Sequence, residues 1–455
     1  MDFNFLKGLE QPVPRYTSYP TVPEWHQSDE SDYLKALQTI KKTDPLSLYF
    51  HIPFCRSMCL YCGCSVILNR NPAIEYNYID SLRKEIHLIR SILTGVPTVT
   101  QIHFGGGTPS GLQCQSLIKL FKHIQEAFII APDNEINMEV DPRTVIDDSG
   151  AFLQLLKNLG FNRISLGIQD TNHRVQAAVK RKQTYYQSKY AYDLCRKLDF
   201  ESINFDLIYG LPFQTSDSFS ETLDLILQMR PDRIALFSYA KVPWLKKHQQ
   251  AIKDDWLPSM EEKFRIYSRS RDRLIQAGYI AIGMDHFALP KDSLAISYLN
   301  KTLIRNFQGY SLPLADNLIG FGISSTGFIN NTYVQNTKSL ASYDEYLQID
   351  RLPIAKTFIL SPEDTLRKWV IHRLMCQFEI EKSEFQTSFG TPFDDHFVQI
   401  RRKLIEMESV GLLKNTCDRL FVTPLGELFV RVIATAFDDY LANKTNNTPI
   451  FSQSI

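Results

Sequence analysis

Four of the eight cysteines lie within ten residues, at positions 55, 59, 62 and 64 of the segment CRSMCLYCGC. The N-terminus carries no basic and then apolar signal, so we expect a cytoplasmic protein whose clustered thiols bind metal or do catalysis rather than form disulfides. Three thiolates spaced C-x3-C-x2-C can ligate three corners of a cubane iron–sulfur cluster. A cubane normally takes four thiolates, so the fourth iron would stay open for an exogenous ligand.

A structural zinc site on the same four cysteines is the alternative. Structural zinc sites usually combine two short knuckles from separate parts of the chain, whereas these four share one loop. Two thiols at C-x-C spacing are also hard to aim at one tetrahedral ion. The sequence therefore favours a [4Fe–4S] cluster on Cys55, Cys59 and Cys62, with Cys64 beside it either serving the substrate or taking no part.

Elements that could position this loop recur along the first two thirds of the chain. Short β-rich segments lie at 47–54, 99–104, 135–140, 163–168, 202–209 and 233–239. Their mean spacing of about 37 residues, with helical patterns in between, predicts βα units and a parallel sheet. Six such units predict an α/β fold with a partial (β/α)6 TIM-like barrel, whose chemistry lies at the C-terminal ends of the strands.

Three regions are expected. Residues 1–40 form an N-terminal arm dense in Pro and Tyr, and residues 41–335 form the barrel with its binding loops. Within the barrel, residues 306–332 are rich in Gly, Ser and Asn, which suits binding loops better than core. Residues 336–455 show consecutive helical patterns and a short hairpin at 411–423, which predicts a mainly helical, winged-helix-like C-terminal domain.

Charge excludes several classes of partner. Lys+Arg and Asp+Glu number 50 each, so the formal net charge is zero. Proteins that bind bulk nucleic acid or anionic membrane surfaces normally carry a basic excess, and no apolar run is long enough to span a membrane. We therefore expect no nucleic-acid partner and no membrane partner. A monomer is also expected. A DNA-binding or structural protein with a zinc knuckle is the alternative that this neutral balance opposes.

The cysteine spacing, with the aromatic Tyr61 before the last ligand, resembles the radical S-adenosylmethionine (SAM) signature. The glycine-rich segment 105–109 (GGGTP) follows the next predicted strand and resembles that superfamily's loop for the methionine amino group. A glycine-rich loop alone is weak evidence. Its place after that strand makes it strong.

The chain resembles, more narrowly, the oxygen-independent coproporphyrinogen III oxidase family. The motifs that carry this resemblance run in order through 15–21 (RYTSYPT), 49–64, 105–109, 139–143 (EVDPR), 167–170 (GIQD), 206–212 (DLIYGLP), 283–287 (GMDHF) and 306–310 (NFQGY). Haem chaperones with a radical-SAM-type barrel share the barrel motifs and are the alternative. The arm sequence and Cys64 oppose that alternative.

The resemblance implies decarboxylation of two propionates of coproporphyrinogen III to vinyl groups, giving protoporphyrinogen IX in haem biosynthesis. A 5′-deoxyadenosyl radical from SAM would take the hydrogen, and an unidentified one-electron donor would reduce the cluster. Two SAM molecules are implied, the first near Tyr49, Gly106 and Glu139, the second near Tyr61, Gly107, Thr108, Gln169, Arg181, Asp206 and Ala240. Cys64 and Tyr61 are the candidate catalytic residues.

Some positions depart from the family pattern. Tyr61 stands where Phe is expected, which adds a hydroxyl that needs a partner. Thr326 stands where the family has an apolar contact to SAM, and Leu289 where a basic residue is common. Because the implied substrate is a tetracarboxylate and the net charge is zero, the positive charge for it must be local, with Arg15 and Arg181 as candidates.

Overall fold

The computed structural model describes residues 10–27, 30–442 and 451–454. Its centre is a mixed sheet in which seven neighbouring strands pair in parallel. In spatial order they are β14 (Asn317–Phe321), β2 (Leu46–Ile52), β5 (Thr98–Gly106), β6 (Ile129–Val140), β7 (Arg163–Gln169), β8 (Ser202–Tyr209) and β9 (Arg233–Ser238). All six predicted strands are present.

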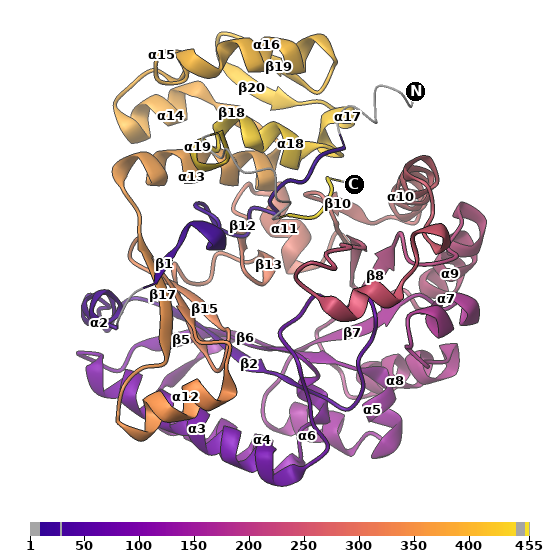
Figure 1. Cartoon of the computed structure of the whole chain (residues 1–455), viewed down its shortest axis with the longest axis vertical. Coiled ribbons are helices and arrows are strands. Elements are labelled where there is room, and N and C mark those ends of the chain that lie inside the picture. Colours follow the sequence, from indigo (N-terminus) through magenta and orange to yellow (C-terminus); the bar gives the residue numbers. More distant parts are fainter. Residues whose placement is uncertain (1–9, 28–29, 443–450, 455) are drawn as a thin grey trace.

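Antiparallel strands extend both edges of this parallel run. Beyond β14 lie β15 (Thr326–Ile329), β16 (Thr332–Asn336), β17 (Ile354–Ile359) and β1 (His26–Gln27), and beyond β9 lie β11 (His286–Ala288) and β10 (Ile280–Ile282). The order of strands ends at β1 and β10 without closing on itself, so the barrel is partial, as predicted (Figure 1).

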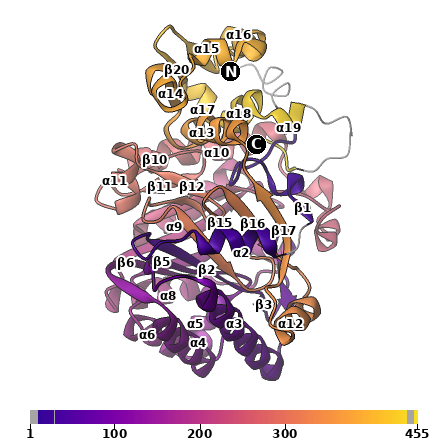
Figure 2. The ribbon, with the colours of Figure 1, turned by 90° about the vertical axis from the view of Figure 1, so that its left-hand side faces the viewer.

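Helices connect the parallel strands and cover the outer face of the sheet. They are α3 (Pro72–Ile92), α4 (Cys114–Ala127), α5 (Pro142–Asp147), α6 (Ala151–Asn158), α7 (His173–Ala178), α8 (Tyr185–Lys197), α9 (Ser216–Met229) and α10 (Met260–Gln276). Figure 2 shows α3, α4 and α6 beneath the strands β2, β5 and β6. Local sequence sets their starts; for example, the Asn71 side chain accepts from the Ala73 N–H directly before Pro72 at the first helical position.

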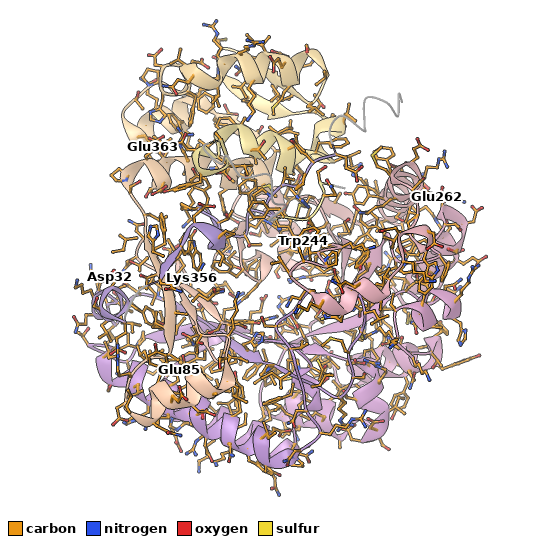
Figure 3. The ribbon with its side chains drawn as sticks, viewed as in Figure 1. Asp32, Glu85, Trp244, Glu262, Lys356 and Glu363 are labelled. Atoms are coloured by element: carbon orange, nitrogen blue, oxygen red, sulfur yellow. The ribbon has the colours of Figure 1, made fainter. Side chains whose placement is uncertain are left out.

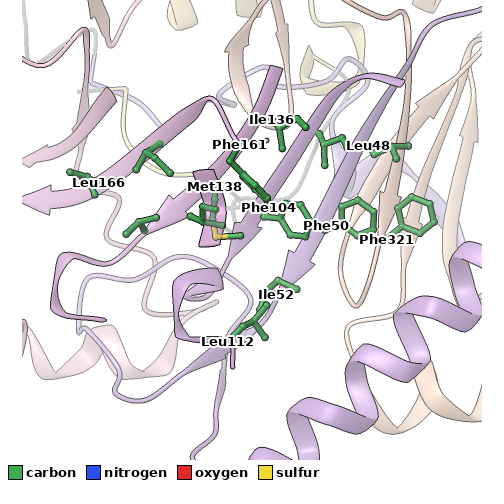
Figure 4. Packing of buried hydrophobic residues seen from close by; sticks show 14 of the residues in the cluster. Leu48, Phe50, Ile52, Phe104, Leu112, Ile136, Met138, Phe161, Leu166 and Phe321 are labelled. Carbon is green, nitrogen blue, oxygen red and sulfur yellow. The ribbon is translucent and has the colours of Figure 1, made fainter. Parts of the chain in front are cut away.

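Aromatic rings bind neighbouring strands together at the core. The ring of Phe50 on β2 stacks on Phe104 of β5 and on Phe321 of β14, with centroids 4.9 Å apart in both pairs (Figure 4). All three side chains are fully buried. Because side chains alternate along a strand, Phe50 faces the helices while its neighbours Tyr49 and His51 face the other side of the sheet.

Residues 306–332 are not mainly binding loops, so that expectation was wrong. They form β13 (Gly309–Ser311), β14, β15 and the start of β16, and β14 is buried along its whole length. The glycines serve close approach of backbones, because a Cβ on Gly320 would lie 2.4 Å from the Thr326 carbonyl oxygen and one on Gly327 would lie 2.7 Å from that of Leu318. Composition alone does not separate such close-packed strands from loops.

The sheet also continues beyond residue 336, because β17 pairs with β16. A buried carboxylate joins this extension to the barrel at α12 (Leu340–Gln348): Glu85 of α3 accepts from the Gly322 N–H at 2.8 Å, from Asn336 at 2.6 Å and from the Tyr343 hydroxyl at 2.5 Å (Figure 3). The predicted division at 335/336 therefore falls inside the sheet, and the helical part begins at α13 (Pro362–Gln377).

The C-terminal part has the predicted winged-helix-like order. After α13 come β18 (Glu379–Glu381), α14 (Lys382–Phe389), α16 (Arg401–Ser409) and the hairpin of β19 (Leu413–Asn415) and β20 (Arg419–Val422), and α18 (Val430–Ala434) packs on α13. It has a hydrophobic core of its own, which Tyr16 and Tyr19 of the arm join.

The arm lies between the barrel and the C-terminal helices, next to the end of the chain. Pro12 forms a β-bridge with Gln453, and the Val13 N–H donates to the Ser452 carbonyl at 3.1 Å. Figure 1 shows the indigo arm beside the yellow end of the chain at this place. Among the residues that the structure describes, no helix is both long and apolar enough to cross a membrane.

Candidate active site

A cavity of about 670 Å³ lies at the C-terminal ends of the parallel strands. Every strand from β5 to β9 contributes its last residues, and the arm and the cysteine loop close other sides. Predicted site residues in its lining are Cys55, Cys59, Tyr61, Cys62, Cys64, Gly106, Gly107, Thr108, Glu139, Gln169, Arg181, Asp206 and Ala240. Residues from positions 55 to 240 of the sequence thus share one cavity.

The cysteine loop leaves β2 and starts in β3 (Phe54–Cys55), which pairs with β4 (Ile67–Leu68). The Cys55 thiol lies 3.2 Å from the Thr108 hydroxyl, and burial raises its pKa to about 11. The Cys64 thiol hydrogen-bonds to Cys62 and lowers the pKa of Cys62 to about 6, which favours a thiolate at that ligand position.

Three thiols on one short loop, all lining one cavity, fit a cluster with an open iron. A single tetrahedral ion needs its ligands gathered at bonds of about 2.3 Å. Within the described part of the chain, no group of three or more Cys, His, Asp or Glu side chains is gathered closely enough to hold one ion. The preference for a cluster over zinc rests on the spacing of the thiols along one loop.

A segment that the sequence analysis did not single out holds the cysteine loop from outside. It follows β9 and contains the short helix η3 (Lys247–Ala251) and the exposed Trp244 labelled in Figure 3. Lys246 donates to the Cys64 carbonyl at 2.7 Å, His248 to that of Cys62 at 2.8 Å and Gln249 to that of Tyr61 at 2.9 Å. Its only signal in the sequence is a run of polar residues after a strand.

The glycine loop at the end of β5 packs tightly against the start of the cysteine loop. The Gly107 N–H donates to the Ile52 carbonyl at 2.8 Å and the Thr108 N–H to the Phe54 carbonyl at 2.9 Å. Gly106 has φ +115°, and a Cβ there would lie 2.6 Å from the His51 ring. Only glycine combines this backbone with this close approach.

Glu139 lies at the end of β6 beside this loop. Its carboxylate accepts from the Gly106 N–H at 3.1 Å, and His103 Nε2 lies 3.5 Å away. Burial opposes the charge of Glu139, but these partners outweigh it, so the pKa of Glu139 lies below its usual value. An ionised carboxylate therefore faces the cavity near the cysteines.

The side chains of Tyr49 and His51 lie next to the glycine loop, close to Gly105 and Gly106. His51 Nε2 donates to the Ser65 carbonyl at 2.9 Å, so its Nδ1, 3.1 Å from the Tyr49 hydroxyl, accepts from that hydroxyl in the neutral ring. Burial lowers the pKa of His51, which favours this neutral form. The two side chains face the same way, as their spacing on one strand predicts, but neither lines the main cavity.

Arg181 lines the cavity and contacts Tyr61. It donates to the Gly167 carbonyl at 2.6 Å and to the Tyr61 hydroxyl at 3.2 Å, and it lies 3.7 Å from the Cys59 sulfur. The hydroxyl that Tyr61 adds to the family pattern therefore has a partner. Asp141 lies 3.6 Å from Arg181.

Asp141 and Arg143 of the EVDPR segment also line the cavity, and the sequence analysis gave them no role. Arg143 pairs with Asp141 at 2.6 Å. Burial would raise the pKa of Asp141, but Arg181 and Arg143 outweigh it and hold the pKa at about 2. The motif itself was the available signal, because two charged residues directly after a strand end point into the mouth of such a barrel.

Asp206 on β8 is a third carboxylate of the cavity, after Glu139 and Asp141. It accepts from the Ser165 hydroxyl at 2.9 Å and from the Asn204 amide at 2.8 Å. Burial and then the charge of Glu139 raise its pKa to about 6. Asp206 thus differs from Glu139 and Asp141, because the pKa values of those two are lowered whereas that of Asp206 is raised.

Thr326 lies apart from the other predicted contacts. It sits on β15, where it pairs with Gln335, and it is not part of the cavity lining. Its expected loop position was wrong, because Thr326 is the first residue of β15, one of three strands that short turns join between residues 317 and 336. Its contact with SAM stays a prediction, as does the monomeric state.

Comparison with known proteins agrees with this geometry. The Radical SAM superfamily profile matches residues 49–226, and the HemN C-terminal domain profile matches residues 360–429. An oxygen-independent coproporphyrinogen III oxidase of Synechocystis sp. is 42% identical over 99% of this chain and 97% of its own length. The Escherichia coli protein of that name is 39% identical over 97% of this chain and 96% of its own.

The chain belongs to the oxygen-independent coproporphyrinogen III oxidase family. A solved structure described as coproporphyrinogen III oxidase (HemN) from Escherichia coli, a radical SAM enzyme, superimposes with a TM-score of 0.90 at 37% identity, covering 96% of this chain and 99% of that one. Full-length relatives with the oxidase name disfavour the haem-chaperone alternative. Membership in the radical SAM superfamily implies a [4Fe–4S] cluster and SAM.

Proposed function

We propose that this protein converts coproporphyrinogen III to protoporphyrinogen IX by oxidative decarboxylation of two propionates. The observation that carries this proposal is the single cavity in which the C-x3-C-x2-C thiols, the glycine loop and the polar strand ends of β6, β7 and β8 meet. The names of full-length relatives support the substrate.

In each half-reaction a propionate side chain loses one hydrogen atom, one electron and CO2, which leaves a vinyl group. We propose that Cys55, Cys59 and Cys62 hold the cluster. When bound, the cluster and SAM would supply two kinds of chemistry: one-electron reductive cleavage of SAM, and removal of the hydrogen atom from the propionate side chain. The electron enters from an unidentified donor, and the electron lost by the substrate leaves to an acceptor.

Two SAM molecules are proposed, because the family resemblance implies them. The first would lie near the ionised Glu139 and the glycine loop at Gly106, backed by Tyr49, which suits an ammonium and backbone contacts. The residues proposed for the second line the same cavity and are Tyr61, Gly107, Thr108, Gln169, Arg181, Asp206 and Ala240.

The remaining residues orient these groups and exclude water. Arg181 is buried, and its hydrogen bonds to Gly167 and Tyr61 fix its side chain. Its positive charge is therefore held near Cys59 before any ligand binds. Cys64 and Tyr61 line the cavity beside the ligand thiols, and we propose that both contact the reacting groups. The segment after β9 holds the cysteine loop in place through Lys246, His248 and Gln249.

Anaerobic reconstitution followed by SAM, a chemical reductant and coproporphyrinogen III tests this proposal. We expect vinyl product to form, together with 5′-deoxyadenosine. Accumulation of 5′-deoxyadenosine without vinyl product would contradict the substrate. Cys59→Ala that keeps full iron content would contradict the ligand set.

A further inference from the structure

A small recess lies beside the main cavity, between the barrel and the C-terminal helices. Arg15 and Ser238 line both spaces, so the recess is adjacent to the larger cavity. Its volume is about 40 Å³, and no cluster cysteine lines it. A water molecule takes about 30 Å³ in the liquid, so this space accepts a group the size of a carboxylate but no ring.

Arg15 and Arg431 line this recess, and a third arginine, Arg305, contacts Arg15 from outside the lining. Arg15 comes from the arm, Arg305 from β12 (Ile304–Asn306) and Arg431 from α18. Arg15 donates to the Ser238 carbonyl at 3.0 Å, and Arg305 donates to the Arg15 carbonyl at 3.2 Å. Arg431 donates to the Val13 carbonyl at 2.9 Å. Backbone oxygens therefore fix all three guanidinium groups.

Two donor atoms of this group have no acceptor. Arg305 is 9% exposed and Arg431 is 5% exposed, yet Nη1 of Arg305 and Nε of Arg431 are buried without a hydrogen-bond partner. A buried polar atom without a partner costs about 1–3 kcal/mol, and more when it is charged. Such atoms in a native fold point to a missing partner.

These arginines also lack the carboxylates that other largely buried arginines have. Arg181, which is 5% exposed, lies 3.6 Å from Asp141, and Arg233 pairs with Asp292 at 2.6 Å. In the described part of the chain, no ion pair involves Arg15, Arg305 or Arg431.

Asp285 is the acid whose charge acts on both Arg15 and Arg431, but its carboxylate is bonded to His286 at 2.7 Å. Burial lowers the pKa of Arg15, and burial together with the charge of Arg15 lowers the pKa of Arg431 to about 9. One carboxylate therefore faces three positively charged arginines. This excess of positive charge favours the binding of an anionic ligand.

We propose that this recess binds a carboxylate of the molecule held in the main cavity. This step rests on the proposed function. The carboxylate then belongs to a propionate that does not react, because the recess is away from the cysteines. Guanidinium groups match carboxylates in shape and charge. Anchoring one propionate here fixes the rotation of the macrocycle and so selects which propionate faces the cluster.

Binding of coproporphyrin III to the reconstituted holoenzyme tests the proposal, with its tetramethyl ester as the uncharged counterpart. We expect Arg15→Gln and Arg431→Gln, which change the two arginines that line the recess, to weaken binding of the free acid by about 10- to 100-fold, the loss typical of a hydrogen bond to a charged group. Binding of the ester should change by less than about 2-fold. Arg271→Gln is the control, because Arg271 on α10 already pairs with Glu427.

A second measurement separates this proposal from the proposed function. Sodium propionate should raise the unfolding midpoint of the wild-type protein, whereas propionamide should not, and Arg15→Gln should abolish the difference. If propionate stabilises the protein in this way but coproporphyrin III does not bind, the recess is a carboxylate site and the proposed substrate is wrong. If the protein converts coproporphyrinogen III and both arginine variants bind the acid like wild type, the recess assignment is wrong.

Discussion

Replacing Gly107 by alanine should separate the glycine loop from the cysteine loop. A Cβ on Gly107 would lie 2.6 Å from the carbonyl carbon and oxygen of Pro53 and 2.9 Å from the carbonyl oxygen of Phe54. Ordinary contacts begin at 3.4 Å, so the two backbones must move apart by about 0.8 Å, the difference between 3.4 and 2.6. The neighbours are backbone atoms, so no side chain can rotate away.

This displacement has a cost that follows from the contacts. Lengthening the Gly107–Ile52 bond by about 0.8 Å from 2.8 Å takes it past hydrogen-bond distance, and the neighbouring Thr108–Phe54 bond of 2.9 Å is strained with it. Each such bond contributes about 1 kcal/mol, and overpacking adds about 1 kcal/mol or more. We expect Gly107→Ala to lower the free energy of unfolding by about 3 kcal/mol.

The assay is urea denaturation of the cluster-free protein, together with iron and sulfide content after anaerobic reconstitution. Cys55 follows Phe54 directly, so the shift also moves a proposed ligand, and we expect iron content to fall well below that of wild type. Gly111→Ala is the matched control, because its Cβ would lie 3.7 Å from Thr108, an ordinary contact. The reasoning is refuted if both variants unfold within about 0.5 kcal/mol of each other and retain equal iron.

Three further predictions concern titratable and thiol groups. Cys62→Ser should lose most of its iron, whereas Cys64→Ser should retain it and lose product formation; equal iron loss in metal analysis would make Cys64 a ligand. Burial raises the pKa of Glu85 from its usual value near 4.5 to about 7, so its contribution to stability is complete below pH 4.5 and is lost as the pH rises through 7. Wild type should therefore lose up to about 3 kcal/mol more than Glu85→Gln between pH 5 and pH 8, and parallel denaturation curves at both pH values would contradict this. The pKa of Asp206 is raised to about 6, so SAM affinity in calorimetry should weaken as the pH falls below 6 and should be flat in Asp206→Asn; the same pH dependence in both proteins would exclude Asp206 from the SAM site.

Local patterns predicted much of the framework and the chemistry. The repeated spacing of β-rich segments predicted the parallel strands, because each βα unit carries its own hydrophobic periodicity. The cysteine spacing predicted that three thiols share one loop, because cysteines within eight residues of chain need no distant partner, and all three line the cavity. The motifs at strand ends predicted the cavity, since the C-terminal ends of parallel strands meet at one edge.

Other features depended on segments that meet only in the folded chain. The glycines between 306 and 332 looked like loop residues, but they allow β14 and β15 to approach closely, and only the pairing partner reveals that. The hold of Lys246 and His248 on the cysteine loop joins positions about 180 residues apart.

The sequence by itself determined the fold class, the cluster motif and the family, because these depend on spacing along the chain. The tertiary structure alone brought Arg15 and Arg431 to one recess, with Arg305 in contact with Arg15, and showed which of their donors lack acceptors. The sequence named Arg15 as a candidate for local positive charge, but the cost of a buried charge depends on what surrounds it. Those surroundings arise only when the arm, the barrel and the last helices pack together.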